Sequence, residues 1–102
     1  MRVKLTPRAL QRARIITAWL RKHRPGAEEV FEQEFEHVID KLALMSPLGA
    51  VGKAYGPSRG RTIWRVLLPN SQQHLYYSID EAKGIVTVRT IWGARRGHSP
   101  KL

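Results

Sequence analysis

The sequence predicts an α+β fold: a short N-terminal strand, then an antiparallel helical hairpin packed on an antiparallel β-meander. Between residues 7 and 45, apolar side chains recur three or four positions apart, which is the spacing of one helix face. Between residues 61 and 92 they alternate with polar ones in three segments, joined by hairpin-sized connectors. A chain of 102 residues suffices for one such core, so we expect residues 1–102 to form a single domain.

The N-terminal half is expected to hold the strand and both helices. Residues 2–6 alternate apolar and basic side chains, as a short edge strand does. Thr6 is placed to cap the first helix, with Pro7 at its first position, where the missing N–H costs nothing. His-Arg-Pro-Gly at 23–26 ends that helix, and Ser46 with Pro47 ends the second. The expected buried stripes are Ala9, Ala13, Ile16 and Leu20, then Phe31, Phe35, Val38, Leu42 and Met45.

The C-terminal half is expected to hold a loop and three strands. Residues 46–60 are rich in Gly and Pro, and we expect a long loop there that includes Lys53. The strands are predicted at 61–69, 74–80 and 84–92. Strict alternation in the last strand predicts two faces. One carries Val86, Val88, Thr90 and Trp92, and the other carries Ile85, Thr87, Arg89 and Ile91.

The formal net charge of +10 is the strongest global signal. Self-repulsion opposes a compact state, so stability does not explain such an excess, and we expect an acidic or polyanionic partner. The charge is also sorted along the chain. Residues 1–24 contain no acid, whereas residues 28–40 contain six carboxylates and no Lys or Arg.

Several classes of chemistry find no support. The absence of Cys excludes disulfides and thiolate catalysis and is compatible with a cytoplasmic location. The four His residues are scattered without metal-ligand spacing, so no metal and no cofactor are expected. No apolar run approaches the roughly 18 residues of a membrane span. Neither a nucleophile elbow nor a phosphate-binding loop occurs.

Basic and aromatic side chains gather on the predicted meander. Arg side chains with a Tyr and a Trp on a sheet face can bind phosphates and stack bases. Arg and His could also support metal-free RNA cleavage by the 2′-hydroxyl. The plain alternative is that the exposed face of a two-layer fold is simply polar. The set is Arg61, Arg65, His74, Tyr76, Arg89, Trp92, Arg95 and Arg96.

The order of motifs resembles the RelE/ParE superfamily of toxins from type II toxin–antitoxin systems. The resemblance covers nearly the whole chain and rests on "LTPRA", "KHRP", "RTIWRVLLPNSQQHLYYSID" and "VTVRTIWGARRGHSP". It implies the same α+β fold and a bacterial cytoplasmic toxin. It also implies a cognate antitoxin that neutralises the toxin through an acidic or amphipathic C-terminal segment.

The resemblance implies two modes of action. RelE-like members cleave mRNA in the ribosome, and for that mode Lys53, Arg61, His74 and Arg95 are the catalytic candidates. The C-terminal Tyr of that branch has no counterpart, because "GHSPKL" contains none. ParE-like members inhibit DNA gyrase, and "LYYSID" with "WGARRG" favours this plasmid-stabilisation branch. The residues expected to contact the target are Arg65, Tyr76, Arg89, Trp92, Arg95 and Arg96. A non-toxic basic nucleic-acid-binding domain is the third alternative.

Overall fold

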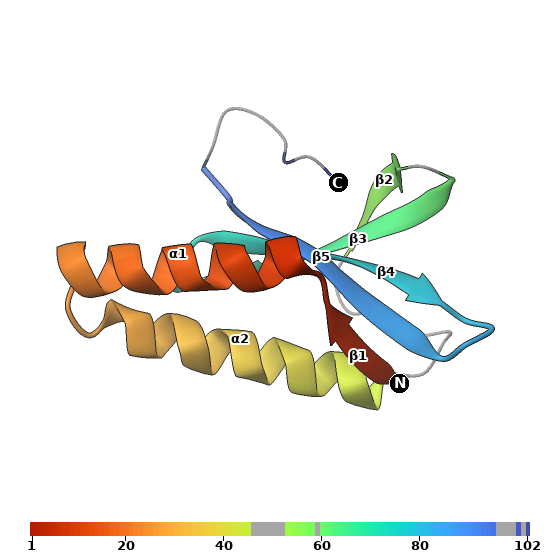
Figure 1. Cartoon of the computed structure of the whole chain (residues 1–102), viewed down its shortest axis with the longest axis horizontal. Coiled ribbons are helices and arrows are strands. Elements are labelled where there is room, and N and C mark those ends of the chain that lie inside the picture. The colour runs from red at the N-terminus through yellow and green to blue at the C-terminus, as the bar shows by residue number, and fades with distance from the viewer. Residues whose placement is uncertain (46–52, 59, 96–99, 101) are drawn as a thin grey trace.

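The structure is a computed structural model that describes residues 1–45, 53–58, 60–95, 100 and 102. Two helices lie together on one side of a five-stranded sheet (Figure 1), as the sequence predicts for an α+β fold. The elements are β1 (Arg2–Leu5), α1 (Pro7–His23), α2 (Ala27–Leu44), β2 (Lys53–Ser58), β3 (Arg61–Leu68), β4 (Gln73–Asp80) and β5 (Ile85–Gly93). The strand order is β1-β5-β4-β3-β2, with β1 parallel to β5 and the other pairs antiparallel.

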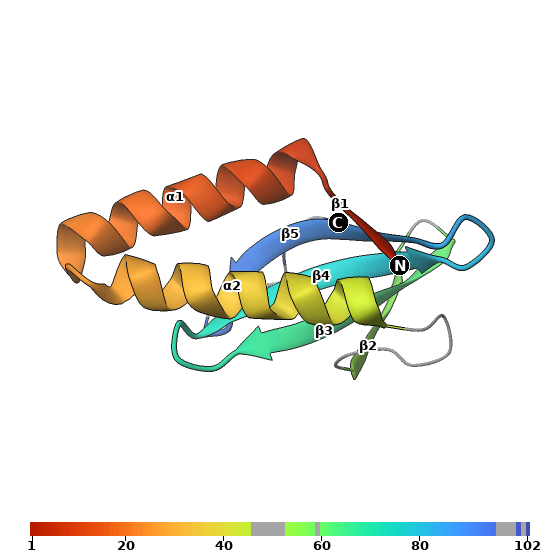
Figure 2. The ribbon, with the colours of Figure 1, turned by 90° about the horizontal axis from the view of Figure 1, so that it is seen from below.

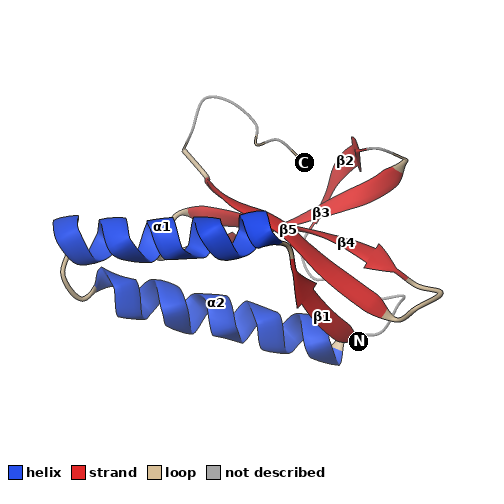
Figure 3. Cartoon of the chain, viewed as in Figure 1, coloured by secondary structure: helices blue, strands red, loops and turns tan. Residues whose placement is uncertain are grey.

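The helical hairpin begins and turns where the sequence predicts. The hydroxyl oxygen of Thr6 accepts a hydrogen bond from the backbone N–H of Ala9 at 3.1 Å, and Pro7 opens α1. At the other end Gly26 takes a φ of 96°, a left-handed conformation that glycine adopts without steric cost. The two helices then run side by side (Figure 3). Neither described helix is long and apolar enough to cross a membrane.

The core lies between the helix pair and one face of the sheet, which Figure 2 shows with α2 crossing in front of the strands. The predicted helix stripes supply much of it, although Ala13 and Phe35 are only partly buried at its margin. Phe31 and Tyr77 are the largest side chains that are fully buried. The sheet contributes Leu68, Leu75, Tyr77, Val86, Val88 and Ile91.

The prediction of one long loop over 46–60 is wrong in its second half. Residues 53–58 form the edge strand β2, so Lys53 begins a strand, while 46–52 and 59 lie outside the described residues. Pro57 is compatible with pairing because it stands in an edge strand. The register with β3 shifts between Ala54 and Gly56, which makes Tyr55 the extra residue of a β-bulge.

A second bulge overturns the predicted faces of the last strand. Tyr76 pairs with Thr90 and Tyr77 with Val88, so Arg89 has no partner of its own on β4. The side-chain alternation therefore switches at Arg89. Ile91 enters the core instead of Thr90, and Trp92 moves to the face that carries His74.

The first helix covers the part of β5 that β1 leaves unpaired. β1 pairs only with residues 85–88 of β5. Beyond them the backbone N–H of Thr6 donates to the carbonyl of Val88 at 3.1 Å, and its hydroxyl donates to the carbonyl of Arg89 at 2.8 Å. The Nε of Arg12 donates to the carbonyl of Ile91 at 3.1 Å. Thr6 and Arg12 thus replace a missing sheet neighbour and protect a strand edge.

A carboxylate of α2 holds the turn between β3 and β4. Glu34 accepts hydrogen bonds from the backbone N–H groups of Asn70 and Ser71, each at 2.9 Å, and from the Ser71 hydroxyl at 2.6 Å. Gln72 stands in this turn with a φ of 54°, unusual for a residue other than glycine. Its carbonyl accepts from the backbone N–H of Ala94 at 2.9 Å, which ties the turn to the exit of β5.

We predict that Thr6→Val destabilises the protein by about 1–2 kcal/mol, because the variant loses the helix cap and the bond to the bulge at nearly constant volume. Chemical denaturation measures the free energy of unfolding. Thr6→Ser is the matched control, since it keeps the hydroxyl. Equal stability of the Val and Ser variants would contradict the role of this hydroxyl.

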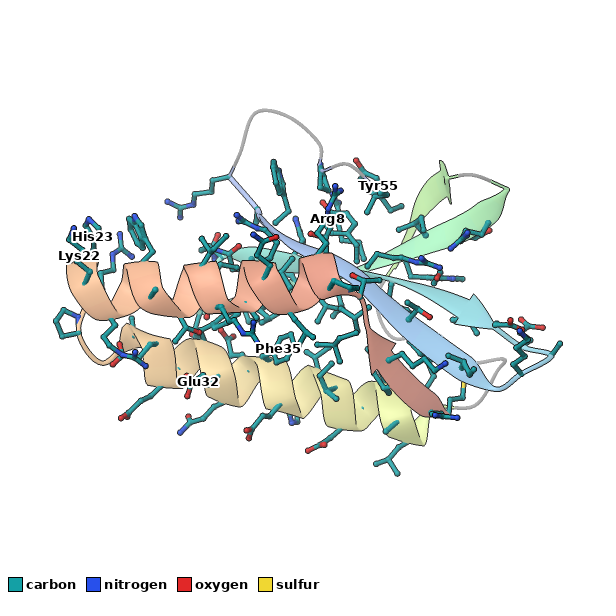
Figure 4. The ribbon with its side chains drawn as sticks, viewed as in Figure 1. Arg8, Lys22, His23, Glu32, Phe35 and Tyr55 are labelled. Carbon is teal, nitrogen blue, oxygen red and sulfur yellow. The ribbon has the colours of Figure 1, made fainter. Side chains whose placement is uncertain are left out.

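We predict that Glu34→Gln lowers the free energy of unfolding by about 1–3 kcal/mol, because a charged acceptor of three hydrogen bonds becomes a neutral one. Glu32→Gln is the control, because Glu32 points outward from the same helix (Figure 4) and is exposed. Denaturation midpoints of the two variants are compared with that of the parent. A Glu34 variant as stable as the Glu32 variant would show that the turn needs no carboxylate.

Candidate functional site

Four of the polar and aromatic side chains on the sheet face away from the helices form one cluster. His74 and Tyr76 alternate on β4 with the core residues Leu75 and Tyr77, so they project to the opposite face. Arg65 of β3 pairs with Tyr76 across the sheet. Tyr55 reaches the same place from the bulge in β2, and Figure 4 shows it on this side of the sheet. We call Tyr55, Arg65, His74 and Tyr76 the His74 cluster.

Ring contacts fix the geometry of the His74 cluster. The rings of Tyr55 and Tyr76 meet edge to face, with centroids 5.1 Å apart and planes at 82°. The rings of His74 and Tyr76 have centroids 6.1 Å apart. The guanidinium carbon of Arg65 lies 5.2 Å from the centroid of the Tyr55 ring, a cation–π distance. Tyr55 and Tyr76 therefore hold the cation and the imidazole in a fixed relation.

His74 is tuned to stay neutral. Burial and, secondly, the positive charge of Arg65 hold its pKa below the ordinary value of 6.5. At neutral pH the ring is therefore unprotonated and can accept a proton. Folding lowers this pKa, so the associated stability is present above pH 6.5 and is lost as the pH falls through the folded pKa.

Trp92 extends the aromatic surface toward α1. It pairs with His74 across β4 and β5 because the bulge at Arg89 turns it to this face. The guanidinium carbon of Arg12 lies 5.3 Å from the centroid of its ring, while Arg12 also binds the backbone of β5. The expected loop over 46–60 contained Tyr55, and neither Tyr55 nor Arg12 stood among the predicted site residues.

The remaining predicted site residues have other positions or contacts. Arg89 donates from Nε to the Ser78 hydroxyl at 3.0 Å, a contact that fixes the bulge. Arg61 is exposed at the start of β3, and Arg95 is exposed just beyond β5. Lys53 pairs through its backbone with Arg65. Arg96 lies outside the described residues.

Two further facts limit the chemistry of this face. Tyr76 is only 3% exposed, so its ring supports Tyr55 and His74 and offers no open stacking surface. Within the described residues, no group of three or more His, Asp or Glu is placed to hold a metal ion. What the face presents is a neutral imidazole, a fixed guanidinium and the partly exposed rings of Tyr55 and Trp92.

Comparison with known proteins adds one structural finding. The chain is similar to the crystal structure of the isolated E. coli RelE toxin, with a TM-score of 0.60 and 23% sequence identity over 95% of this chain and 87% of that one. At this identity the similarity shows a shared fold and no shared activity. No family model matches the sequence, and no curated protein matches it.

We predict that His74 titrates below pH 6.5 and that Arg65→Gln moves its midpoint upward, because one of the two causes of the shift is removed while burial remains. NMR of the imidazole C–H resonances measures both midpoints. Arg61→Gln is the control, since it removes the same charge from an exposed position of the same strand. A wild-type midpoint at or above 6.5 would contradict the assignment.

Proposed function

We propose that this protein is the growth-inhibiting toxin of a bacterial type II toxin–antitoxin module and that it cleaves RNA with the His74 cluster. The observation that carries the proposal is the pairing of a neutral imidazole with a guanidinium that aromatic rings hold in place. A general base and a cation that stabilises the phosphorane are two of the groups that metal-free phosphoryl transfer uses. The fold shared with the RelE toxin agrees with this proposal.

The chemistry would follow the arrangement of the His74 cluster. His74 accepts the proton of an RNA 2′-hydroxyl, and the 2′-oxygen attacks the adjacent phosphorus. Arg65 neutralises the charge that accumulates on the phosphorane oxygens. The bond from phosphorus to the 5′-oxygen then breaks, and this oxygen takes a proton from water. The products are a 2′,3′-cyclic phosphate and a 5′-hydroxyl.

Electrostatics and stacking would bring the substrate to this face. The net charge of +10 attracts a polyanion and raises the association rate. Tyr55 and Trp92 keep part of their surface exposed and can contact unstacked bases. Arg61 lies exposed at the start of β3 and would add a phosphate contact along the same sheet.

Gyrase inhibition is the second candidate mode of action. The sequence "WGARRG" favours it, and Arg95 is exposed just beyond β5, where a protein target can reach it. In either mode the protein acts in the cytoplasm without a cofactor. The same positive charge suits a cognate antitoxin with an acidic or amphipathic C-terminal segment.

We predict that induced expression arrests growth and produces new RNA 5′ ends, and that co-expression of the adjacent gene product prevents both. His74→Gln should lower the cleavage rate about 100-fold or more, because a positioned general base is lost. Arg65→Gln should also lower it. Arg14→Gln, an exposed change on α1, is the charge-matched control and should cleave like the parent.

The outcomes separate the alternatives. Growth arrest with altered supercoiling and intact RNA would replace RNA cleavage by gyrase inhibition. Soluble expression without any growth defect would contradict the toxin role itself. Full activity of His74→Gln would remove His74 from the chemistry.

A further inference from the structure

A polar hollow lies at the end of the sheet, on the opposite side of β4 from the His74 cluster. Its volume is about 390 Å³, and it lies between the C-terminal end of α1, the turn after β3 and the exit of β5. Arg24 and Arg95 both line it, together with Gln73. Gln73 precedes His74 in β4, and consecutive strand residues project to opposite faces. The hollow and the His74 cluster are therefore neighbours on the two sides of one strand.

The walls of this hollow are held by specific hydrogen bonds. Glu34 accepts hydrogen bonds from the backbone N–H groups of Asn70 and Ser71 in the turn after β3. The carbonyl of Gln72 accepts a hydrogen bond from the backbone N–H of Ala94, which follows β5. The side-chain Nε2 of Gln72 donates to the carbonyl of Pro69 at 2.6 Å. The backbone of the turn is thus preorganised before any ligand arrives, which lowers the cost of binding.

Gln73 lines both hollows and carries an acceptor without a partner in the described part of the chain. Its Oε1 atom is buried and has no hydrogen-bond partner among the described residues. A buried carbonyl without a donor is costly and rare in folded proteins. Because the atom is buried, a ligand N–H group would reach and satisfy it only after the Gln73 side chain rotates toward the hollow, while a bare anion would not satisfy it at all.

An apolar hollow of about 290 Å³ continues the polar one, and the two share Arg24, Ser71, Gln73 and Gly93. Ile15 and Trp19 line the apolar part and are 47% and 51% exposed. The Trp19 ring stacks on His23 with centroids 4.5 Å apart, and the His23 Nδ1 lies 3.0 Å from the Trp19 carbonyl. An exposed aromatic ring held in one orientation is a good surface for a base.

We propose that the joined hollows bind one unstacked nucleotide, with its phosphate between Arg24 and Arg95 and its base along Trp19, and that the Gln73 side chain rotates so that its Oε1 accepts from a base N–H. Guanidinium groups suit phosphate oxygens through paired hydrogen bonds. Each hollow is close to or within the roughly 300–1,000 Å³ usual for small ligands. The proposal rests on RNA being the target, and it places a neighbouring nucleotide beside the one at His74.

The test measures binding without cleavage. Adenosine 5′-monophosphate is titrated into the wild-type protein while NMR follows the Trp19 indole and the Gln73 side-chain amide. We expect both signals to shift and inorganic phosphate to leave the Trp19 signal in place. Purine riboside 5′-monophosphate lacks the exocyclic amino group and should bind more weakly to the wild type, because it has no donor for Gln73.

Two variants localise the site. Arg24→Gln should weaken binding of the nucleotide about tenfold, whereas Arg21→Gln should leave it unchanged, because Arg21 has the same charge in the same helix but does not line the hollows. Gln73→Leu should abolish the difference between the two nucleotides. If that variant does not fold, the comparison of the two nucleotides on the wild type still tests the donor.

Each other result would overturn the proposal. These are shifts confined to the His74 cluster, equal effects of the Arg21 and Arg24 variants, equal binding of both nucleotides, or an acidic peptide displacing the nucleotide with higher affinity. RNA cleavage in cells without these shifts would remove the second site and leave the proposed activity. NMR shifts on nucleotide binding without RNA cleavage in cells would support the second site and remove the proposed activity.

Discussion

The hydroxyl of Thr6 connects the three elements on which the architecture depends. Its oxygen accepts a hydrogen bond from the backbone N–H of Ala9 at the start of α1, and its O–H donates to the carbonyl of Arg89 in β5, while β1 ends one residue before it. These two hydrogen bonds hold the start of α1 beside the bulge at Arg89 in β5. Because α1 and α2 form one hairpin, the position of the whole helical layer over the sheet follows from this contact.

Two bulges shape the candidate site. The bulge at Arg89 turns Trp92 to the face of His74, and the bulge at Tyr55 lets an edge strand reach Arg65 and Tyr76. Bulges are common beside active sites because they re-aim side chains without changing the rest of the sheet. Here they convert regular strands into a surface where a cation and a neutral imidazole meet. Burial and, secondly, the positive charge of Arg65 lower the pKa of His74 on this surface.

The fold shared with the RelE toxin therefore explains the scaffold and leaves the chemistry to particular side chains. His74, Arg65 and Tyr55 come from three different strands, and Trp92 comes from a fourth. On the other side of β4, Gln73 and the turn held by Glu34 face a separate hollow. One short segment of chain, at the start of β4, thus contributes side chains to two surfaces on opposite sides of the strand.

The sequence by itself determined the helical hairpin, its cap and stop signals, the three meander strands and the basic character of the molecule. These features depend on residues within a few positions of one another, such as Thr6 with Ala9 or the apolar stripes of the helices. Only the tertiary structure decided the faces of β5, the strand formed by 53–58 and the partners of Arg12 and Glu34. The bond from Thr6 to Arg89 spans 83 residues, and that from Ser71 to Glu34 spans 37. No local pattern encodes such contacts, because they form only when the layers pack together.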